Sequence, residues 1–191
     1  MAGGLKVIAG LGNPGPEYAD TRHNVGWWLL DHLAAEWGFG RFRREKESAV
    51  AAGRVGEHPA RLVKPLTYMN LSGRVLAPLR RSVAFDVSRD LLVVVDDVAL
   101  PPGRVRLRPE GSAGGHNWLR SVEQSLGTRE YARLRIGVGS APPGWDLARW
   151  VLAAMPKADK QAVIDLFPDL LDGVECWLAG DTDAAMNRCN R

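Results

Sequence analysis

The sequence predicts an α/β fold: one three-layer domain, residues 1–191, in which helices flank a twisted, mixed and mostly parallel sheet. Three observations predict it. Short apolar runs typical of buried strands alternate with amphipathic helical patterns, as in parallel strands joined by crossover helices. A strand pair within residues 49–64 adds antiparallel strands. The length and the 46% hydrophobic composition suit one domain with one core.

The chain begins with a strand pattern followed by a helix pattern. Residues 5–11 form an apolar run that is too short for a membrane span and is shaped like a buried strand, not a signal peptide. Residues 25–37 place apolar side chains on one stripe and are followed by Gly38. This pattern is typical of an amphipathic helix with a glycine at its C-terminal end.

A hairpin and a second helix are expected next. Residues 49–55 and 60–64 predict two strands joined by a turn at residues 56–59. Residues 70–83 have a helical pattern, and Pro78 should kink or end this helix because proline has no N–H to donate.

The clearest strand of the chain is LLVVVD, residues 91–96, whose continuous apolar run is typical of a central parallel strand. The remaining patterns predict strands over residues 105–108 and 134–138, a helix over residues 117–126, and a helical tail over residues 159–186 with breaks near Pro168 and Gly173.

The net charge of +3 is distributed unevenly along the chain. Residues 141–191 carry five basic and eight acidic side chains, so residues 1–140 carry a net charge of +6. A basic body permits an anionic partner such as a nucleic acid. A well-solvated surface without such a partner is the alternative.

A glycine-rich loop, GLGNPGPEYADTRHNVG, follows the first strand over residues 10–26. Its spacing matches the G-x-G-x-x-G turn of dinucleotide-binding proteins, which places free N–H groups at the start of a helix. Here Pro14 and Pro16 remove two of those donors, and the next helix begins only at Val25. The context therefore favours an ordered loop at a strand end that presents polar side chains for other chemistry.

Two histidines and a pair of carboxylates lie in such loops. His23 ends the first glycine-rich loop, His116 lies in a second one, and Asp96 and Asp97 end the central strand. A carboxylate there can fix the tautomer of an imidazole. Successive strand side chains point opposite ways, so one carboxylate faces a given histidine, and Asp96 is the nearer to the strand. Asn70 offers an amide where a helix starts, with a plain N-cap as the alternative.

Other enzyme classes fit the sequence poorly. It has no G-x-S-x-G, no H-E-x-x-H and no phosphate-binding G-x-x-x-x-G-K-[ST] motif. Cys176 and Cys189 match no metal or redox spacing and indicate free thiols in a reducing cytoplasm. What remains is a histidine–aspartate pair among asparagines, which suits activation of water by a general base without a metal or cofactor.

Four motifs together resemble bacterial peptidyl-tRNA hydrolase: GLGNPGPEYADTRHNVG, KPLTYMNLSG, VVVDDVALPPGRVRLRPEGSAGGHN and RLRIGVG. The resemblance is collinear and continues through WVL into the C-terminal helical region. It implies a cytoplasmic enzyme, usually a monomer with no membrane association, that cleaves the ester between a peptide and the 3′ end of tRNA. It also implies that the reaction needs no metal.

The resemblance assigns roles to individual positions. His23 matches the catalytic base and Asp96 the carboxylate that orients it, while Trp118 and Ser140 depart from the pattern, where glycine and a basic residue are usual. Trp118 is expected to narrow or reshape the mouth of the site. The other matched positions are Asn13, Asn70 and Asn117, which line the site, Tyr18 and Tyr68, which contact tRNA, and Arg108 and Arg135, which meet tRNA phosphates. Asn70 is also expected to take part in catalysis, and His116 is expected to bind the substrate.

General physical chemistry is compatible with this role. An imidazole titrates near neutrality and, as a general base, contributes roughly 10²–10⁴-fold in rate. A positioned amide donor on the developing oxyanion adds about 10²–10³-fold. Two other functions compete: an RNA-binding module that has lost turnover, as in chloroplast splicing factors of similar sequence, and a dinucleotide-dependent enzyme. Hydrolysis of N-acetyl-aminoacyl-tRNA separates the first from an enzyme, and NAD(P) binding tests the second.

Overall fold

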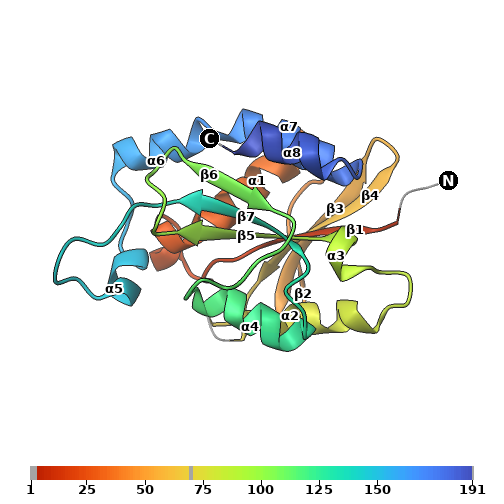
Figure 1. Cartoon of the computed structure of the whole chain (residues 1–191), viewed down its shortest axis with the longest axis horizontal. Coiled ribbons are helices and arrows are strands. Elements are labelled where there is room, and N and C mark those ends of the chain that lie inside the picture. Colours follow the sequence, from red (N-terminus) through yellow and green to blue (C-terminus); the bar gives the residue numbers. More distant parts are fainter. Residues whose placement is uncertain (1–3, 69–70, 191) are drawn as a thin grey trace.

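One seven-stranded sheet runs through the residues that the computed structural model describes, 4–68 and 71–190 (Figure 1). Its strand order is β2-β3-β4-β1-β5-β7-β6. The four central strands β4, β1, β5 and β7 are parallel, and the pairings of β2 with β3, β3 with β4 and β6 with β7 are antiparallel. The strands are β1 (Lys6–Gly10), β2 (Arg43–Glu45), β3 (Ser48–Val55), β4 (His58–Pro65), β5 (Leu91–Asp97), β6 (Val105–Arg108) and β7 (Ala132–Gly137).

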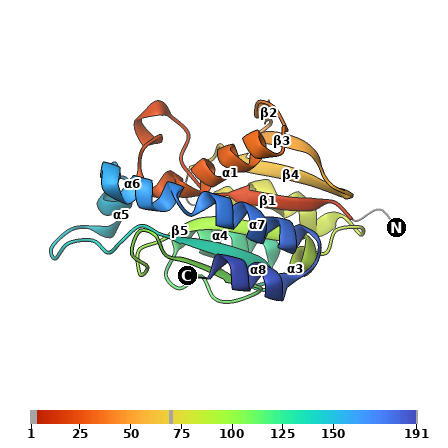
Figure 2. The same ribbon diagram turned by 90° about the horizontal axis from the view of Figure 1, so that it is seen from above.

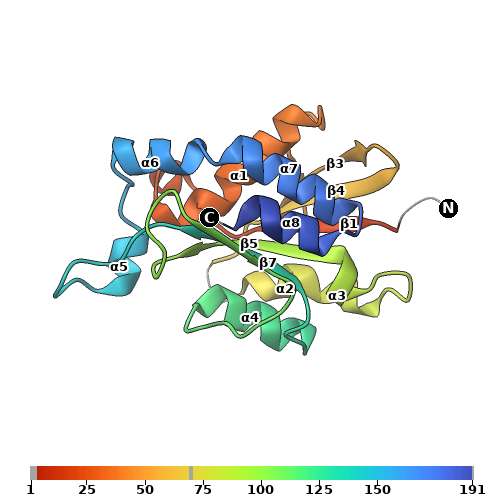
Figure 3. The ribbon, with the colours of Figure 1, turned by 45° about the horizontal axis from the view of Figure 1, so that its top comes forward.

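Helices cover both faces of this sheet and confirm the predicted three-layer α/β fold. Figures 1 and 2 show α1, α6, α7 and α8 on one face, and Figure 3 shows α2 and α4 together on the other, with α5 at one end of the molecule. The α-helices are α1 (Val25–Glu36), α2 (Ser72–Leu76), α3 (Val87–Asp90), α4 (Asn117–Leu126), α5 (Leu147–Val151), α6 (Lys157–Ile164), α7 (Phe167–Leu178) and α8 (Thr182–Cys189). Short 3-10 helices are η1 (Pro16–Tyr18), η2 (Arg22–Asn24) and η3 (Ala77–Arg81).

The central strands are buried on both faces. Along β5, Leu92 and Val94 belong to the core beneath α1 and α7, whereas Val93 and Val95 belong to the core beneath α2 and α4. All four side chains are inaccessible to solvent. Burial on both faces explains why this strand is a continuous apolar run in the sequence.

Two glycines allow α1 to start directly against the sheet. A Cβ at Gly26 would lie 2.7 Å from the Leu11 carbonyl and 2.8 Å from the Val94 carbonyl, and a Cβ at Gly10 would lie 2.7 Å from the Gly26 carbonyl. No side chain fits at either position. The glycines of the first loop therefore bring the start of α1, and His23 just before it, to the carboxyl ends of β1 and β5.

The predicted hairpin is confirmed, but its turn is shorter than expected. Val55 pairs with His58, so only Gly56 and Glu57 form the turn, and Gly56 has a φ of +56°. His58 and Pro59 belong to β4 instead. A two-residue turn with positive φ matches the twist of the two strands, which favours it over a longer turn.

The helical tail is interrupted at two places, of which one was predicted correctly. Pro168 lies in the first turn of α7, where its missing N–H costs nothing, and α6 ends just before it. Gly173 does not break the chain. It lies inside α7, where a glycine is needed because a side chain would collide with Cys189 Sγ of α8. The second interruption falls at Gly180, which has a φ of +88°.

The helix predicted over residues 70–83 is found only in part. In the region predicted as a helix over residues 70–83, α2 ends at Leu76 and continues as the 3-10 helix η3, which has Pro78 in its first turn. The short elements β2, α3 and α5 were not predicted. No helix of the described residues is both long enough and apolar enough to cross a membrane.

Candidate active site

The first pair at the site is His23 and Asp96. His23 lies in η2, immediately before α1, and Asp96 is the penultimate residue of β5. His23 Nδ1 and Asp96 Oδ1 are 2.7 Å apart, and both side chains are almost completely buried. The adjacent Asp97 contacts Arg135 instead. The alternation of side chains along β5 therefore selects Asp96 as the partner of His23, as predicted.

His116 binds the same carboxylate oxygen. It precedes α4 in the second glycine-rich loop, and its Nε2 lies 3.1 Å from Asp96 Oδ1. Burial alone would raise the pKa of Asp96, but the adjacent His23 and His116 together hold that pKa well below its usual range. Asp96 is thus an anion that accepts from both rings.

This arrangement fixes the tautomers of both histidines. To donate to Asp96, His23 must carry its proton on Nδ1 and His116 on Nε2. The opposite nitrogens, His23 Nε2 and His116 Nδ1, are buried and have no hydrogen-bond partner within the described part of the chain. In the neutral ring, His23 Nε2 therefore carries a lone pair that no side chain of the described residues uses.

Trp118 forms a wall behind the histidine. Its indole is fully buried and stacks on the His23 ring with 4.0 Å between ring centroids and 20° between planes. Trp118 lines the cavity that contains His23 while its side chain packs into the core beneath α4, so its effect on the mouth of the site stays a prediction. Ser140, the other departure from the family pattern, is exposed in the loop after β7.

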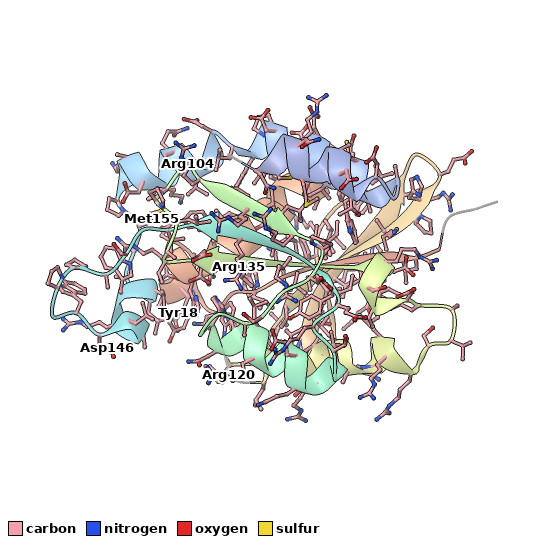
Figure 4. All side chains as sticks on the ribbon, viewed as in Figure 1. Tyr18, Arg104, Arg120, Arg135, Asp146 and Met155 are labelled. Carbon is pink, nitrogen blue, oxygen red and sulfur yellow. The ribbon has the colours of Figure 1, made fainter. Side chains whose placement is uncertain are left out.

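Two cavities meet at this end of the sheet. One, of about 370 Å³, is lined by His23, Asp96 and His116 together with residues of α5. The other, of about 410 Å³, is lined by Asn13, Tyr18 and Tyr68, among other residues. Asn117, at the first position of α4, lines both. Figure 4 labels Tyr18 of η1, Arg120 of α4, Arg135 of β7 and Asp146, the N-cap of α5, which come from four separate segments near this end of the sheet.

A buried arginine holds α5 against the His23 loop. The Arg22 guanidinium donates to the backbone carbonyls of Trp150, Ala153 and Ala154 at 3.2–3.4 Å. It also stacks on the Trp150 ring at 3.4 Å. Trp150 in turn donates to the Gly139 carbonyl. No local sequence pattern indicated these contacts, because they join segments that are distant along the chain.

The predicted arginines lie in different settings. Arg135 lines the cavity of His23 and donates to the carbonyls of Ser112 and Ala113, so it also holds the second glycine-rich loop. Arg108 is exposed at the far end of β6, in register with Arg133. Asp96 is in register with Ile136, so Arg108 lies three residues, or about 10 Å, farther along the sheet. Asn70 lies outside the described residues.

His23, Asp96 and His116 are also the group of described residues whose arrangement suits a metal ion, since one ligand atom of each lies within 4.8 Å of the others. These atoms already form hydrogen bonds with one another. An ion would have to displace both protons that the carboxylate accepts.

The family model, the related sequences and the solved structures described next all point to the same family. The family model described as peptidyl-tRNA hydrolase matches residues 7–191. The peptidyl-tRNA hydrolase of Gemmatimonas aurantiaca is 45% identical over 98% of this chain and 100% of its own length. That of Symbiobacterium thermophilum is 49% identical over 97% and 98%. A crystal structure of the enzyme from Acinetobacter baumannii superposes with a TM-score of 0.90 at 32% identity, covering 97% of this chain and 94% of the other.

Proposed function

This chain belongs to the peptidyl-tRNA hydrolase family, and we propose that His23 is the general base of its reaction. In this proposal Asp96 orients His23 through a hydrogen bond, and His116 binds and holds Asp96. The enzyme hydrolyses the ester that joins a peptide to the 3′ end of tRNA. The observation that carries the proposal is the buried lone pair of His23 Nε2, whose tautomer is fixed by the hydrogen bond of Nδ1 to Asp96.

The proposed chemistry begins with water. His23 Nε2 accepts one proton from a water molecule while the oxygen attacks the ester carbonyl carbon. The tetrahedral intermediate then breaks its bond to the 3′ oxygen of tRNA, and the imidazolium returns the proton to that leaving oxygen. Asp96 stays ionised throughout and stabilises the imidazolium, because its carboxylate accepts from Nδ1.

Asparagines provide the amides that bind the substrate in this proposal. Asn13 is buried, and its Oδ1 has no partner within the described residues, so it is free to accept the N–H of a peptide or N-acetyl group. A free α-amino group has a pKa of about 8, is largely cationic at neutral pH and is costly to desolvate. This difference would favour N-blocked substrates. Asn117 and Asn70 are proposed to bind the carbonyl.

The tRNA is proposed to lie across the second cavity and its rim. Tyr18 and Tyr68 line that cavity, and the exposed Tyr68 side chain suits stacking on a base. Arg135 and Arg108 are proposed to meet phosphates. We further propose that the protein acts as a cytoplasmic monomer without a metal, since the atoms that an ion would use are already hydrogen-bonded to one another.

Release of tRNA from N-acetyl-aminoacyl-tRNA tests this proposal, measured with and without a strong chelator. Equal turnover in both is expected. Loss of turnover on chelation, restored by a divalent ion, would replace the metal-free mechanism. Binding of uncharged tRNA without any turnover would favour an RNA-binding module instead.

A further inference from the structure

The fully buried indole of Trp118 stacks on the imidazole of His23. We propose that Trp118 is a positioning residue for His23: its indole fixes the plane of the imidazole and thereby the direction of Nε2. This inference rests on the role proposed above for His23.

The geometry is that of a rigid stacked pair. The ring centroids are 4.0 Å apart and the planes differ by 20°, which is close stacking for two aromatic rings. Trp118 is the second residue of α4, is completely buried and packs in one apolar cluster with Leu119 and Val122. The indole is therefore a fixed surface against which His23 rests.

The hydrogen bond to Asp96 cannot fix the ring plane by itself. It restrains one atom, Nδ1, but the ring can still tilt about its Cβ–Cγ bond, because this torsion has a broad minimum and a hydrogen bond tolerates tens of degrees of misalignment. His116 does not restrict this turning, since its ring lies 5.8 Å away and is tilted by 43°. A flat surface parallel to the imidazole removes this freedom.

The indole also favours the charged form of the ring. When His23 takes a proton from water, the resulting imidazolium lies against the π face of Trp118, which attracts a cation more strongly than a neutral ring. The transition state gains more from this contact than the ground state does. Only such a differential contact raises kcat.

An unpaired donor indicates that core filling alone does not explain the tryptophan. Trp118 Nε1 is buried and has no hydrogen-bond partner among the described residues. A buried donor without a partner costs stability. Leucine would occupy the core without that cost, so the aromatic face is the property that core filling does not explain.

Three variants test the inference: Trp118→Leu, which removes the aromatic face, Trp118→Phe, which keeps one, and Val122→Ala, a matched core change one turn along the same helix. Trp118→Leu should lower kcat about 10-fold with KM for N-acetyl-aminoacyl-tRNA within twofold of wild type, and Trp118→Phe should restore most of kcat. Val122→Ala should lower Tm but leave kcat unchanged. Unchanged kcat in a folded Trp118→Leu protein, or equal losses in Trp118→Leu and Trp118→Phe, would overturn the inference.

A measurement on the wild-type protein is independent of whether the leucine variant folds. The ring protons of His23, assigned by their absence in His23→Ala, should be shifted upfield in the NMR spectrum by the indole ring current. Ordinary shifts for these protons would overturn the inference. A fully active His23→Ala protein would instead reject the proposed role of His23, so the two failures are distinguishable.

Discussion

Asn24 holds Asn13 by both of its backbone groups. The Asn13 N–H donates to Asn24 Oδ1 at 2.8 Å, and Asn24 Nδ2 donates to the Asn13 carbonyl at 3.0 Å. Both residues are buried. The paired hydrogen bonds fix the first glycine-rich loop at Asn13, and among the described residues the side-chain Oδ1 of Asn13 has no hydrogen-bond partner.

Asn13→Ala should narrow the difference in kcat/KM between N-acetylated and free aminoacyl-tRNA, because the acceptor for the blocked N–H is removed. Loss of one such hydrogen bond corresponds to about 1 kcal/mol, or roughly fivefold in the ratio. The ratio is measured with the two substrates made from the same tRNA. Asn187→Ala, at an exposed position on α8, is the control. A wild-type ratio in Asn13→Ala would mean that another group recognises the blocked nitrogen.

His23→Ala should lower kcat by about 10²–10⁴-fold while the affinity for tRNA stays nearly constant, because the base acts only in the transition state. Turnover measures kcat, and inhibition by uncharged tRNA measures the affinity for tRNA. His58→Ala, a partly exposed histidine in β4, should behave as wild type. Near-normal kcat in His23→Ala would exclude this side chain as the base.

Asp96→Ala should lower kcat less than His23→Ala does, because an unoriented imidazole still accepts a proton from poorer geometry. The double variant should be little worse than His23→Ala alone, since both residues act on the same step. The measurement is kcat of the two single variants and the double variant at one pH. Multiplicative losses in the double variant would show that Asp96 acts independently of His23.

Asp96 should also make stability depend on acidity. The two histidines hold its folded-state pKa well below the ordinary value of about 3.9, so its contribution is complete above that value and is lost as pH falls below it. The slope from this one carboxyl is about 1.4 kcal/mol per pH unit. Urea unfolding between pH 3 and 5 should show a shallower loss in Asp96→Asn than in wild type. Equal slopes would contradict the depressed pKa.

Arg108→Ala and Arg135→Ala should each raise KM for whole tRNA substrates more than they lower kcat. Each lost phosphate contact should flatten the salt dependence of binding by about 0.7–0.9 log–log units. Arg188→Ala is the control, because Arg188 lies on α8, on the face of the sheet opposite α4, and this variant should leave KM and the salt dependence unchanged. Because Arg135 also holds the carbonyls of Ser112 and Ala113, a fall in kcat with an unchanged salt slope would assign it to the loop instead.

The sequence by itself determined the longer helices and strands and the polar residues at their ends, but not the short elements β2, α3 and α5. The apolar run of β5 located its last residues. The alternation of strand side chains indicated that one carboxylate of the pair Asp96 and Asp97 faces a given histidine, and the position closer to the strand indicated Asp96. Val25 was correctly identified as the start of α1. These are local properties, because periodicity and turn residues report which face of an element is buried and where the element stops.

Only the tertiary structure decided which side chains meet. That His23 and His116 share one oxygen of Asp96, and that Trp118 stacks on His23, depends on how α4 and the loop before it pack beside β5. The pairing register of β6 and β5 with β7 likewise places Arg108 well away from the level of Asp96. Such contacts join residues far apart along the chain, and the close packing of whole helices on the sheet selects them, so no local pattern records them.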